Sequence, residues 1–372
     1  MLQATLSLLA AVLGSHAPDT SASAAANRCA AVLTRDGRVI DADFYRRMAG
    51  FAAVAGTRGG LGRRQYLVWR ADDGTQPGTL RSALKAASEA GGGWVSFAPE
   101  LHRRIIRVQA PLRPGSNITV DGGCAEPQLV GVGRGSLFHL RGVANVVLAR
   151  MQMTQAGGPV DGDCVTVSHG ADRIWIANNR IRACKDGLVD VTRPEGRTMR
   201  VTISGNALSD HDKAILVDGG VGGVCGGPPA IKLTLFRNSF DRTGQRHPRV
   251  SGSAFVHAAQ NRLRFSPRRR GAGSMGGSSG IVAGGGARVL AEDLLFEPQR
   301  GQRLRLTEAL PDAVGVAPCA QTAIRVERAS GPEPAPSFRP ELVGQAPYAL
   351  PGARGSARLG RLIDLDTGSE VR

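Results

Sequence analysis

Six charged residues between positions 163 and 249 recur at a nearly regular spacing. The acidic ones are Asp163, Asp186 and Asp190, and the basic ones are Lys213, Arg246 and Arg249. The steps from Asp163 to Asp190, on to Lys213 and on to Arg246 are 27, 23 and 33 residues. A chain that coils once per step would gather these side chains on one side. Three carboxylates suit a hard cation, and fixed cations beside them suit an anionic substrate.

A second repeat indicates which elements would position these residues. Four segments (173–181, 200–208, 232–240 and 255–263) align on one asparagine, namely Asn179, Asn206, Asn238 and Asn261. In each segment an apolar or β-branched run precedes the asparagine, and an apolar residue follows it two positions later. The steps between the asparagines are 27, 32 and 23 residues. Such periods are typical of arrays that stack one supersecondary unit.

The repeated unit is predicted to be a strand. The runs alternate with a period of two and are rich in β-formers, which argues against a helical hairpin. The connections are too short for crossover helices, so the pattern favours a parallel β-helix over a doubly wound sheet. We expect the stacked asparagines to hydrogen-bond to one another and to the turn backbone. The alternative is a β-sandwich in which the asparagines align by chance.

Composition divides the chain into regions. Residues 1–17 hold an apolar stretch of secretory length with a small-x-small end, which predicts a signal peptide and a secreted protein. Residues 18–47 are expected to form an exposed leader, residues 48–298 the β-helix domain, and residues 299–372 an irregular tail. No apolar run reaches 18 residues, so no transmembrane helix is expected. Residues 79–91 carry a helical apolar stripe that stops at three glycines, and this helix would cap the open end of the coil.

The formal charge of +16 requires an account of possible partners. Nucleic acid is the first candidate for so basic a chain. Aromatic residues make up only 4% of the chain, and no helix-turn-helix, zinc-finger or aromatic RNA-binding signature occurs. A polyanionic polysaccharide would be attracted by the same field. We therefore expect a monomer that binds an anionic polysaccharide and neither nucleic acid nor a membrane; a basic surface without a partner is the alternative.

Six cysteines are compatible with an oxidised, exported protein. Six cysteines allow 15 pairings, and the sequence does not choose among them. Cys164 and Cys184 lie in strand-like or turn segments, where each can be half of a disulfide or a small buried apolar residue. Because no C-x-x-C spacing occurs, a zinc site is not expected.

Taken in order, the motifs of this chain resemble the pectate lyase family, polysaccharide lyase family 1. The resemblance covers roughly residues 48–298 and includes TLRSAL, SNITVDG, GDCVTV, RIWIAN, DGLVDVT, VTISGNALSDHDKAILV and RNSFDRTGQRHPRV. Single motifs such as DGLVD are weak signals. Their order and separations make the resemblance strong.

The resemblance implies an all-β fold, a right-handed parallel β-helix with an N-terminal capping helix. It also implies cleavage of α-1,4-polygalacturonate by Ca²⁺-assisted β-elimination. In this family the positions of Asp163, Asp186 and Asp190 hold Ca²⁺, that of Lys213 binds a substrate carboxylate and that of Arg246 is catalytic. A second substrate-binding arginine usually ends the last motif, where this chain has Ser251. Arg249 or Arg242 is the candidate to replace it.

Two other functions remain compatible with the pattern. One is a lyase or hydrolase acting on another uronate or on a neutral glycan. A glycosidase needs an acid/base pair of carboxylates, which the aspartates can supply, but Lys213 and Arg246 would then have no role. The other is a β-helix that binds polysaccharide without cleaving it. Formation of a 4,5-unsaturated uronate from polygalacturonate in the presence of Ca²⁺ would distinguish a pectate lyase from both of these alternatives.

Overall fold

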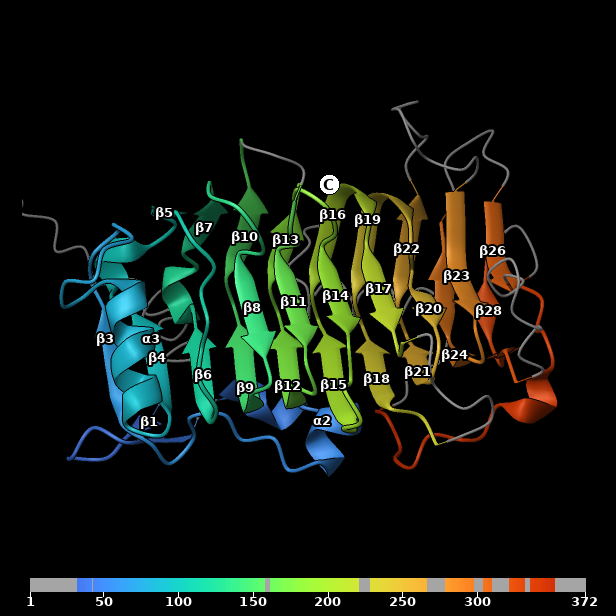
Figure 1. Cartoon of the computed structure of the whole chain (residues 1–372), viewed down its shortest axis with the longest axis horizontal. Helices are drawn as coiled ribbons and strands as arrows, with labels where there is room; N and C mark the ends of the chain where they lie inside the picture. Colours follow the sequence, from blue (N-terminus) through green and yellow to red (C-terminus); the bar gives the residue numbers. More distant parts are fainter. Residues whose placement is uncertain are drawn as a thin grey trace, which may run out of the picture.

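The computed structural model describes residues 32–41, 43–157, 161–220, 228–265, 278–297, 304–309, 321–331 and 335–351. In these residues nearly all strands belong to three parallel sheets that run side by side along one long axis (Figure 1). From β8 (Phe138–Arg141) onward the chain passes from one sheet to the next in turn, so that each coil adds one strand to each sheet. The predicted parallel β-helix is confirmed, and the β-sandwich alternative is excluded.

The sheets are named by their number of described strands. The ten-stranded sheet contains β3 (Gln65–Val68), β4 (Gly93–Phe97), β6 (Ile118–Asp121), β9 (Ala144–Ala149), β12 (Asp172–Ala177), β15 (Met199–Ser204), β18 (Ile231–Phe236), β21 (Ala254–Ala259), β24 (Arg288–Glu292) and β27 (Ala323–Val326). The nine-stranded sheet contains β5 (Ile105–Val108), β7 (Gln128–Gly131), β10 (Gln152–Gln155), β13 (Arg180–Arg182), β16 (Ala207–Lys213), β19 (Ser239–Gln245), β22 (Arg262–Phe265), β25 (Leu294–Phe296) and β28 (Ala329–Ser330). The seven-stranded sheet contains β8 (Phe138–Arg141), β11 (Val165–Ser168), β14 (Val189–Thr192), β17 (Ile215–Asp218), β20 (Arg249–Ser251), β23 (Ser278–Gly284) and β26 (Leu304–Ala309).

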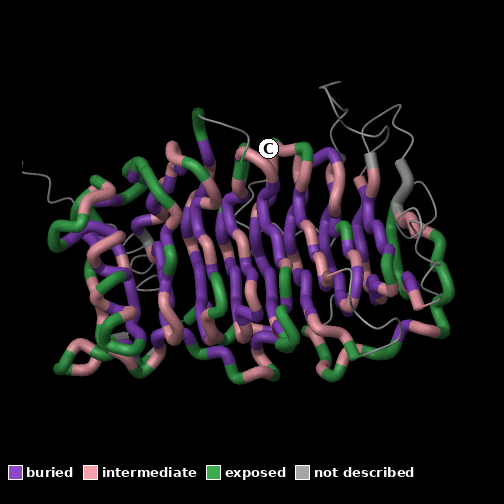
Figure 2. The backbone as a smooth tube through the Cα atoms, viewed as in Figure 1, coloured by how far each residue is buried: buried purple, intermediate pink, exposed green. Residues whose placement is uncertain are grey.

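The interior of the coil is a column of apolar side chains, which the buried segments of Figure 2 follow. In β14, Val189 and Val191 are fully buried in this core. Because successive strand residues point to opposite faces, Asp190 between them faces outward. The same alternation places Thr166 of β11 on the outer face, and it pairs in register with Asp190. The outer face of the seven-stranded sheet is therefore where polar side chains can gather.

The predicted asparagine ladder is present on the inside of a turn. Each ladder asparagine donates its side-chain amide to the carboxamide oxygen of the next, with N–O distances of 3.0–3.1 Å along Asn179, Asn206, Asn238 and Asn261. The backbone N–H groups of the first three also donate to the following carboxamide oxygen. All four residues are at most 2% exposed. The ladder thus satisfies polar groups that the coil buries.

The helix predicted over residues 79–91 is α3 (Leu80–Glu89). Thr79 caps it, since its hydroxyl accepts a hydrogen bond from the backbone N–H of Ser82 at 3.2 Å. The buried stripe of α3 joins the central core and contacts β3 and β4, the first strands of the ten-stranded sheet. Figure 1 places α3 at this end of the coil. The capping helix is confirmed.

The segment predicted as an exposed leader is packed in its described part. It contains β1 (Val32–Leu33), β2 (Val39–Asp41) and the 3₁₀ turn η1 (Asp43–Arg47). Val39 and Phe44 are buried, and the Phe44 ring stacks on Trp175 with centroids 5.4 Å apart. The segment is therefore not exposed at Val39 and Phe44, whose apolar side chains pack with Trp94, Val147 and Trp175 on the outside of the ten-stranded sheet. The predicted signal peptide, residues 1–17, lies outside the described residues.

The coil also continues beyond the predicted boundary at residue 298. Strands β26, β27 and β28 extend all three sheets into the segment that was expected to be irregular. Further on, the Tyr348 hydroxyl lies 2.5 Å from the Thr234 hydroxyl, and the Tyr348 ring packs edge-on against Phe51. Phe51 belongs to the short helix α2 (Gly50–Val54). The described residues of the tail therefore add strands and cover the ten-stranded sheet. No helix in the described part of the chain is long and apolar enough to cross a membrane.

Candidate active site

The predicted site residues come together where the chain enters the seven-stranded sheet. Asp163 precedes β11, Gly187 precedes β14, Lys213 precedes β17, and Arg246 precedes β20. Backbone hydrogen bonds hold these entry turns in a row: Cys164 N to Gly187 O at 3.1 Å, Leu188 N to Lys213 O at 3.1 Å, and Ile215 N to Arg246 O at 2.8 Å. The stacking expected from the sequence spacing is therefore present in four successive coils.

Asp163 is a buried carboxylate with two fixed donors. It is 7% exposed; its Oδ2 accepts from the Thr166 hydroxyl at 2.7 Å, and its Oδ1 accepts from the backbone N–H of Gly187 at 3.0 Å. Burial raises the pKa of Asp163, and the nearby charge of Asp186 adds to this rise against the effect of the donors. The carboxylate is thus held in place without a cationic partner in direct contact.

Asp190 is the least satisfied carboxylate of the site. It is 9% exposed, and its Oδ1 has no hydrogen-bond partner. Burial raises the pKa of Asp190 to about 8, and repulsion from Asp163 and Asp186 adds to the rise although Arg246 and Lys213 lower it. A buried oxygen without a partner costs free energy unless another group or an ion satisfies it. In this state Asp190 holds a proton near neutral pH.

Gly187 has a role that the sequence pattern did not indicate. A Cβ at this position would lie 2.8 Å from Oδ1 of Asp190 and 2.9 Å from Oδ1 of Asp163. Glycine is therefore required here to let the two carboxylates approach one another over the turn. The position is visible in the sequence as the Gly of DGLVD, but only the structure shows what it faces.

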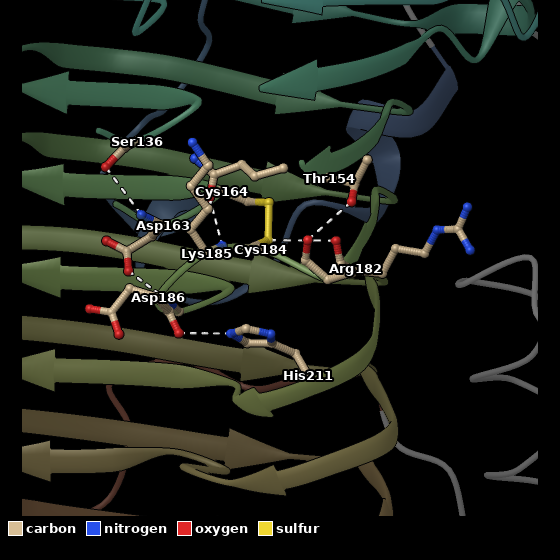
Figure 3. The surroundings of a disulfide bond; sticks show 12 residues. Ser136, Thr154, Asp163, Cys164, Arg182, Cys184, Lys185, Asp186 and His211 are labelled. Atoms are coloured by element: carbon tan, nitrogen blue, oxygen red, sulfur yellow. Dashed lines mark hydrogen bonds between the residues drawn. A yellow bond between two sulfur atoms is a disulfide. The ribbon is translucent and has the colours of Figure 1, made fainter. Parts of the chain in front are cut away.

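Asp186 and Lys213 form an ion pair at the edge of the site. The Lys213 ammonium donates to Oδ1 of Asp186, and both side chains are about one-third to two-fifths exposed, at 34% and 41%. The backbone of Asp186 is fixed by two further contacts: its N–H donates to Gly162 O at 3.1 Å, and its carbonyl oxygen lies 2.7 Å from Nε2 of His211 (Figure 3). His211 is a supporting residue that sequence reasoning missed, although it stands two positions before Lys213.

Arg246 is half-buried and lies within electrostatic reach of two aspartates. Its charge lowers the pKa of both Asp163 and Asp190. Its Nε is buried without a hydrogen-bond partner, and its φ of 65° is a conformation that side-chain-bearing residues rarely adopt. The following residue, His247, anchors the turn.

His247 is buried and neutral, which makes the Arg246 turn sensitive to acid. It lies 2.7 Å from the Thr243 hydroxyl through Nε2 and 2.8 Å from Ser279 O through Nδ1. Burial lowers its pKa from 6.5 to about 4. The unfolded chain binds a proton below pH 6.5 and the folded protein does not until pH 4, so stability falls as pH decreases through this window.

We expect the free energy of unfolding to fall by about 3 kcal/mol between pH 6.5 and 4 through His247 alone. Denaturant unfolding at a series of pH values measures the slope. His247→Gln should flatten that slope while lowering stability at neutral pH, whereas His102→Gln, at the surface of another turn, should leave it unchanged. An equal slope in His247→Gln and the wild-type protein would contradict the assignment.

The two arginines considered as replacements for the missing one differ in position. Arg242 is held by Asp210 through two hydrogen bonds of 2.5 and 2.9 Å and also contacts Asp241, so it is engaged elsewhere. Arg249 is exposed and pairs in register with Leu216, which pairs with Asp190. Arg249 thus lies on the same outward column as Asp190, two coils further along. Of the two, Arg249 is the one on the sheet that carries the aspartates.

A disulfide bond joins the coils that carry the acidic residues. Cys164, next to Asp163, is bonded to Cys184, two residues before Asp186 (Figure 3). The sequence left open whether these two cysteines form a disulfide or are small buried apolar residues. The structure shows that they form a disulfide and are also buried in the core. The bond fixes the relative position of two entry turns.

We expect the double variant Cys164→Ser, Cys184→Ser to unfold with a free energy lower by about 3 kcal/mol, because the bond closes a loop spanning 20 residues. Urea denaturation of the variant and the wild-type protein measures the difference. The paired replacement is needed, since either single variant would leave a free thiol. An unchanged unfolding midpoint would show that the bond does not stabilise these turns.

The donor chemistry of the site fits a hard divalent cation in part. Asp163 and Asp190 present buried carboxylate oxygens to one side of Gly187, and one oxygen of Asp190 lacks a partner. Carboxylate oxygens are the ligands that Ca²⁺ prefers. In the described part of the chain no three His, Cys, Asp or Glu side chains already surround a common point. The reason lies in Asp186, whose carboxylate is turned onto Lys213. A three-carboxylate site requires Asp186 to leave that ion pair.

Comparisons with known proteins bear on this arrangement. No protein-family model matches the chain. The curated pectate lyase 1 of Chamaecyparis obtusa is 32% identical over 234 residues, which are 57% of this chain and 58% of the relative. Pectate lyase 1 of Juniperus ashei is 32% identical over 226 residues, 55% of this chain and 58% of the relative. Over this segment the chain resembles pectate lyases. The predicted resemblance is confirmed, and the chain spans a little over half the length of these relatives.

Solved structures agree with the pectate lyase fold over a longer stretch. Jun a 1, the major allergen from cedar pollen, matches 88% of this chain and 95% of its own with a TM-score of 0.59 and 21% identity. A mutant pectate lyase from Bacillus subtilis matches 84% of this chain and 94% of its own with a TM-score of 0.57 and 13% identity. At these identities the matches concern the fold alone.

Proposed function

We propose that this protein is a pectate lyase that cleaves α-1,4-polygalacturonate by Ca²⁺-assisted β-elimination and releases 4,5-unsaturated oligogalacturonates. One observation carries the proposal: two buried carboxylates, one with an unpartnered oxygen, lie within electrostatic reach of Lys213 and Arg246 on the outer face of the coil. This is the combination that a bridging cation and an anionic sugar require together. The curated relatives named pectate lyase support it.

In the proposed site, Asp163, Asp186 and Asp190 hold Ca²⁺. When bound, Ca²⁺ withdraws charge from the substrate carboxylate and thereby acidifies the neighbouring C5 proton. Lys213, freed from Asp186, binds a substrate carboxylate with its ammonium group. Lys213 is paired with Asp186, so it has to exchange this partner before it can bind a substrate carboxylate.

Arg246 is proposed to act at the reacting carbon. β-Elimination removes the C5 proton and expels the C4 oxygen, so negative charge develops on the uronate. A guanidinium holds its proton very strongly in water, which makes it a poor base while it is solvated. Its buried Nε is without a hydrogen-bond partner, so the group is incompletely solvated from the start. From this position the charged Arg246 can stabilise the developing carbanion, and it can accept the C5 proton only after its guanidinium has lost a proton to solvent.

The proposal extends to the setting of the enzyme. The Cys164–Cys184 disulfide favours an oxidising compartment, in line with a secreted protein. The substrate is proposed to be a polyuronate bound by a monomer. A solved pectate lyase from a Bacillus species, similar to this chain in fold with a TM-score of 0.52, is in complex with trigalacturonate.

The direct test follows the ultraviolet absorbance of unsaturated uronate while the protein acts on polygalacturonate and Ca²⁺. We expect absorbance to rise, and a chelator to stop the rise until Ca²⁺ is restored in excess. Absence of unsaturated product at every Ca²⁺ concentration would overturn the proposal.

Hydrolysis is a second candidate because of one observation. With a pKa of about 8, Asp190 is protonated near neutral pH and can serve as a general acid beside the buried Asp163. Under this reading Lys213 and Arg246 have no chemical role. The two candidates differ in their products, since hydrolysis adds water to the cleaved bond and elimination does not.

Restoring the missing arginine tests substrate binding. Ser251 donates its hydroxyl to Asp218 at 3.1 Å, so an arginine at 251 would meet Asp218 before it meets substrate. We expect Ser251→Arg alone to lower KM only slightly, and Ser251→Arg combined with Asp218→Asn to lower KM by roughly ten-fold with kcat unchanged, because a charge-assisted contact contributes about 1.5–3 kcal/mol. Steady-state kinetics with Asp218→Asn alone as the control measures this. An unchanged KM in the double variant would contradict a substrate contact at this position.

A further inference from the structure

A group of basic side chains lies along the seven-stranded sheet: Arg113 one coil before β8, His139 and Arg141 in β8, and His169 and Arg193 directly after β11 and β14. Its members, here called the basic patch, are Arg113, His139, Arg141, His169 and Arg193. The three arginines are exposed. Within the described residues no carboxylate forms an ion pair with these arginines, and the patch has one acidic neighbour, Glu195, 3.5 Å from Nε2 of His169.

Strand register places Arg113 and His139 on the same column as Asp190, whereas Arg141, His169 and Arg193 lie toward the other end of the strands. His139 pairs with Thr166, and Thr166 pairs with Asp190. Arg113 follows Leu112, which bridges Phe138, so Arg113 continues this column by one coil. Neighbouring strands are about 4.8 Å apart, which puts His139 roughly 10 Å from Asp190 along the coil axis. Arg113 and His139 of the patch therefore lie on the same outer face of the seven-stranded sheet as Asp190 of the candidate site.

The two imidazoles of the patch are held together by one buried hydroxyl. Oγ of Ser168 lies 2.9 Å from Nε2 of His139 and 2.8 Å from Nδ1 of His169, and Ser168 is 2% exposed. A hydroxyl has one proton to donate, so one imidazole accepts it and the other donates an N–H. The ring centroids are 6.3 Å apart. This arrangement is built by the fold and is not a chance gathering of mobile surface side chains.

The positive groups of the patch repel one another in the absence of a ligand. Burial lowers the pKa of His139, and the charges of Arg113, His169, Arg141 and Arg193 lower it further. An anion placed among these groups would relieve that repulsion. The patch thus has the chemistry of an anion site, with arginines suited to bidentate contact with a carboxylate.

We propose that the basic patch binds a uronate carboxylate of the substrate chain, two to three sugar residues away from the bond that is cleaved. This inference rests on the proposed function for the identity of the chain. A polyuronate carries one carboxylate per sugar, and one pyranose is similar in length to the spacing between coils. A chain laid along the sheet therefore brings successive carboxylates over successive coils, from the cation site to the patch. The patch selects long anionic substrates.

The test compares the double variant Arg113→Gln, Arg141→Gln with the wild-type protein on oligogalacturonates of increasing length. Arg182→Gln is the matched control, because Arg182 is also exposed on a strand but belongs to the nine-stranded sheet. We expect kcat/KM of the double variant to equal that of the wild type on the shortest cleaved substrate and to fall about ten-fold below it on long ones, through KM. An equal loss at every length, or no loss at any length, would overturn the proposal.

Binding without turnover separates this inference from the proposed function. Electrophoresis through gels containing polygalacturonate, without Ca²⁺, measures retardation of each variant. Retardation of the wild type and of Arg182→Gln, lost in the double variant, supports the patch even if the protein cleaves nothing. Equal retardation of all three proteins, or none of any, contradicts it. Gels containing a neutral glucan should retard no variant; retardation there would show that the surface does not select carboxylates.

Discussion

Replacing Arg246 with lysine should lower kcat on polygalacturonate by about a hundred- to a thousand-fold, the range seen when one preorganised donor is removed from a reacting centre. The guanidinium of Arg246 lies within electrostatic reach of Asp163 and Asp190, and its turn is fixed by the buried His247. Lysine keeps the charge, but its ammonium is a point charge on a flexible four-carbon stem. It therefore cannot take the place of the planar guanidinium group. KM should change little, because Lys213 and Arg249 remain.

Steady-state kinetics of Arg246→Lys, with Arg242→Lys as control, measures this effect. Arg242 lies four residues earlier and is engaged by Asp210 and Asp241 on the surface, so its replacement should leave kcat within about two-fold. Thermal unfolding of both variants checks that the fold is retained. Near-normal turnover in Arg246→Lys would remove Arg246 from the reacting centre.

Replacing Asp190 with asparagine should abolish the response to Ca²⁺ and stabilise the protein in its absence. Burial raises the pKa of Asp190 from 3.8 to about 8. For a carboxyl whose pKa is raised on folding, stability is greatest below the unfolded pKa and is lost as pH rises through the folded one. Between pH 3.8 and 8 the wild type therefore loses stability on the order of a few kcal/mol, and the neutral variant does not.

Thermal unfolding of Asp190→Asn over this pH range, with and without Ca²⁺, measures both effects. Ca²⁺ should raise the wild-type midpoint more at pH 8 than at pH 5, because cation and proton compete for the same carboxylate. Asp72→Asn is the control, since Asp72 is an exposed residue paired with Arg70 far from the site. A Ca²⁺-dependent shift of wild-type size in Asp190→Asn would exclude Asp190 as a ligand.

The coil itself follows from local sequence features. The recurring asparagines and the period-two runs specify a strand and a buried turn in each coil, and α3 follows from an amphipathic stripe with a threonine cap. Strands β26 to β28 escaped prediction because they lie among Pro, Arg and Gly, where no asparagine marks the turn. The burial of Phe44 was also hidden, since one aromatic residue in a polar segment has no period.

The candidate site, like the fold, was predicted from the sequence only in part. Spacing predicted which coils carry Asp163, Asp186, Asp190, Lys213 and Arg246, because the coil length converts sequence distance into stacking. Spacing does not specify side-chain pairing. Asp186 turns to Lys213 instead of to the other aspartates, Ser251 turns to Asp218, and the disulfide is one of the 15 pairings that six cysteines allow. These contacts depend on rotamers and neighbours from other coils.

The most direct test of the account is the mass of the products from one defined oligogalacturonate in the presence of Ca²⁺. β-Elimination only divides the substrate, so the masses of the two products should add up to the mass of the substrate, and the fragment from the reducing side of the cleaved bond should carry the double bond at its new non-reducing end. Mass spectrometry after partial digestion measures both fragments. Products whose masses exceed the substrate by one water would show hydrolysis and contradict the roles given to Lys213 and Arg246.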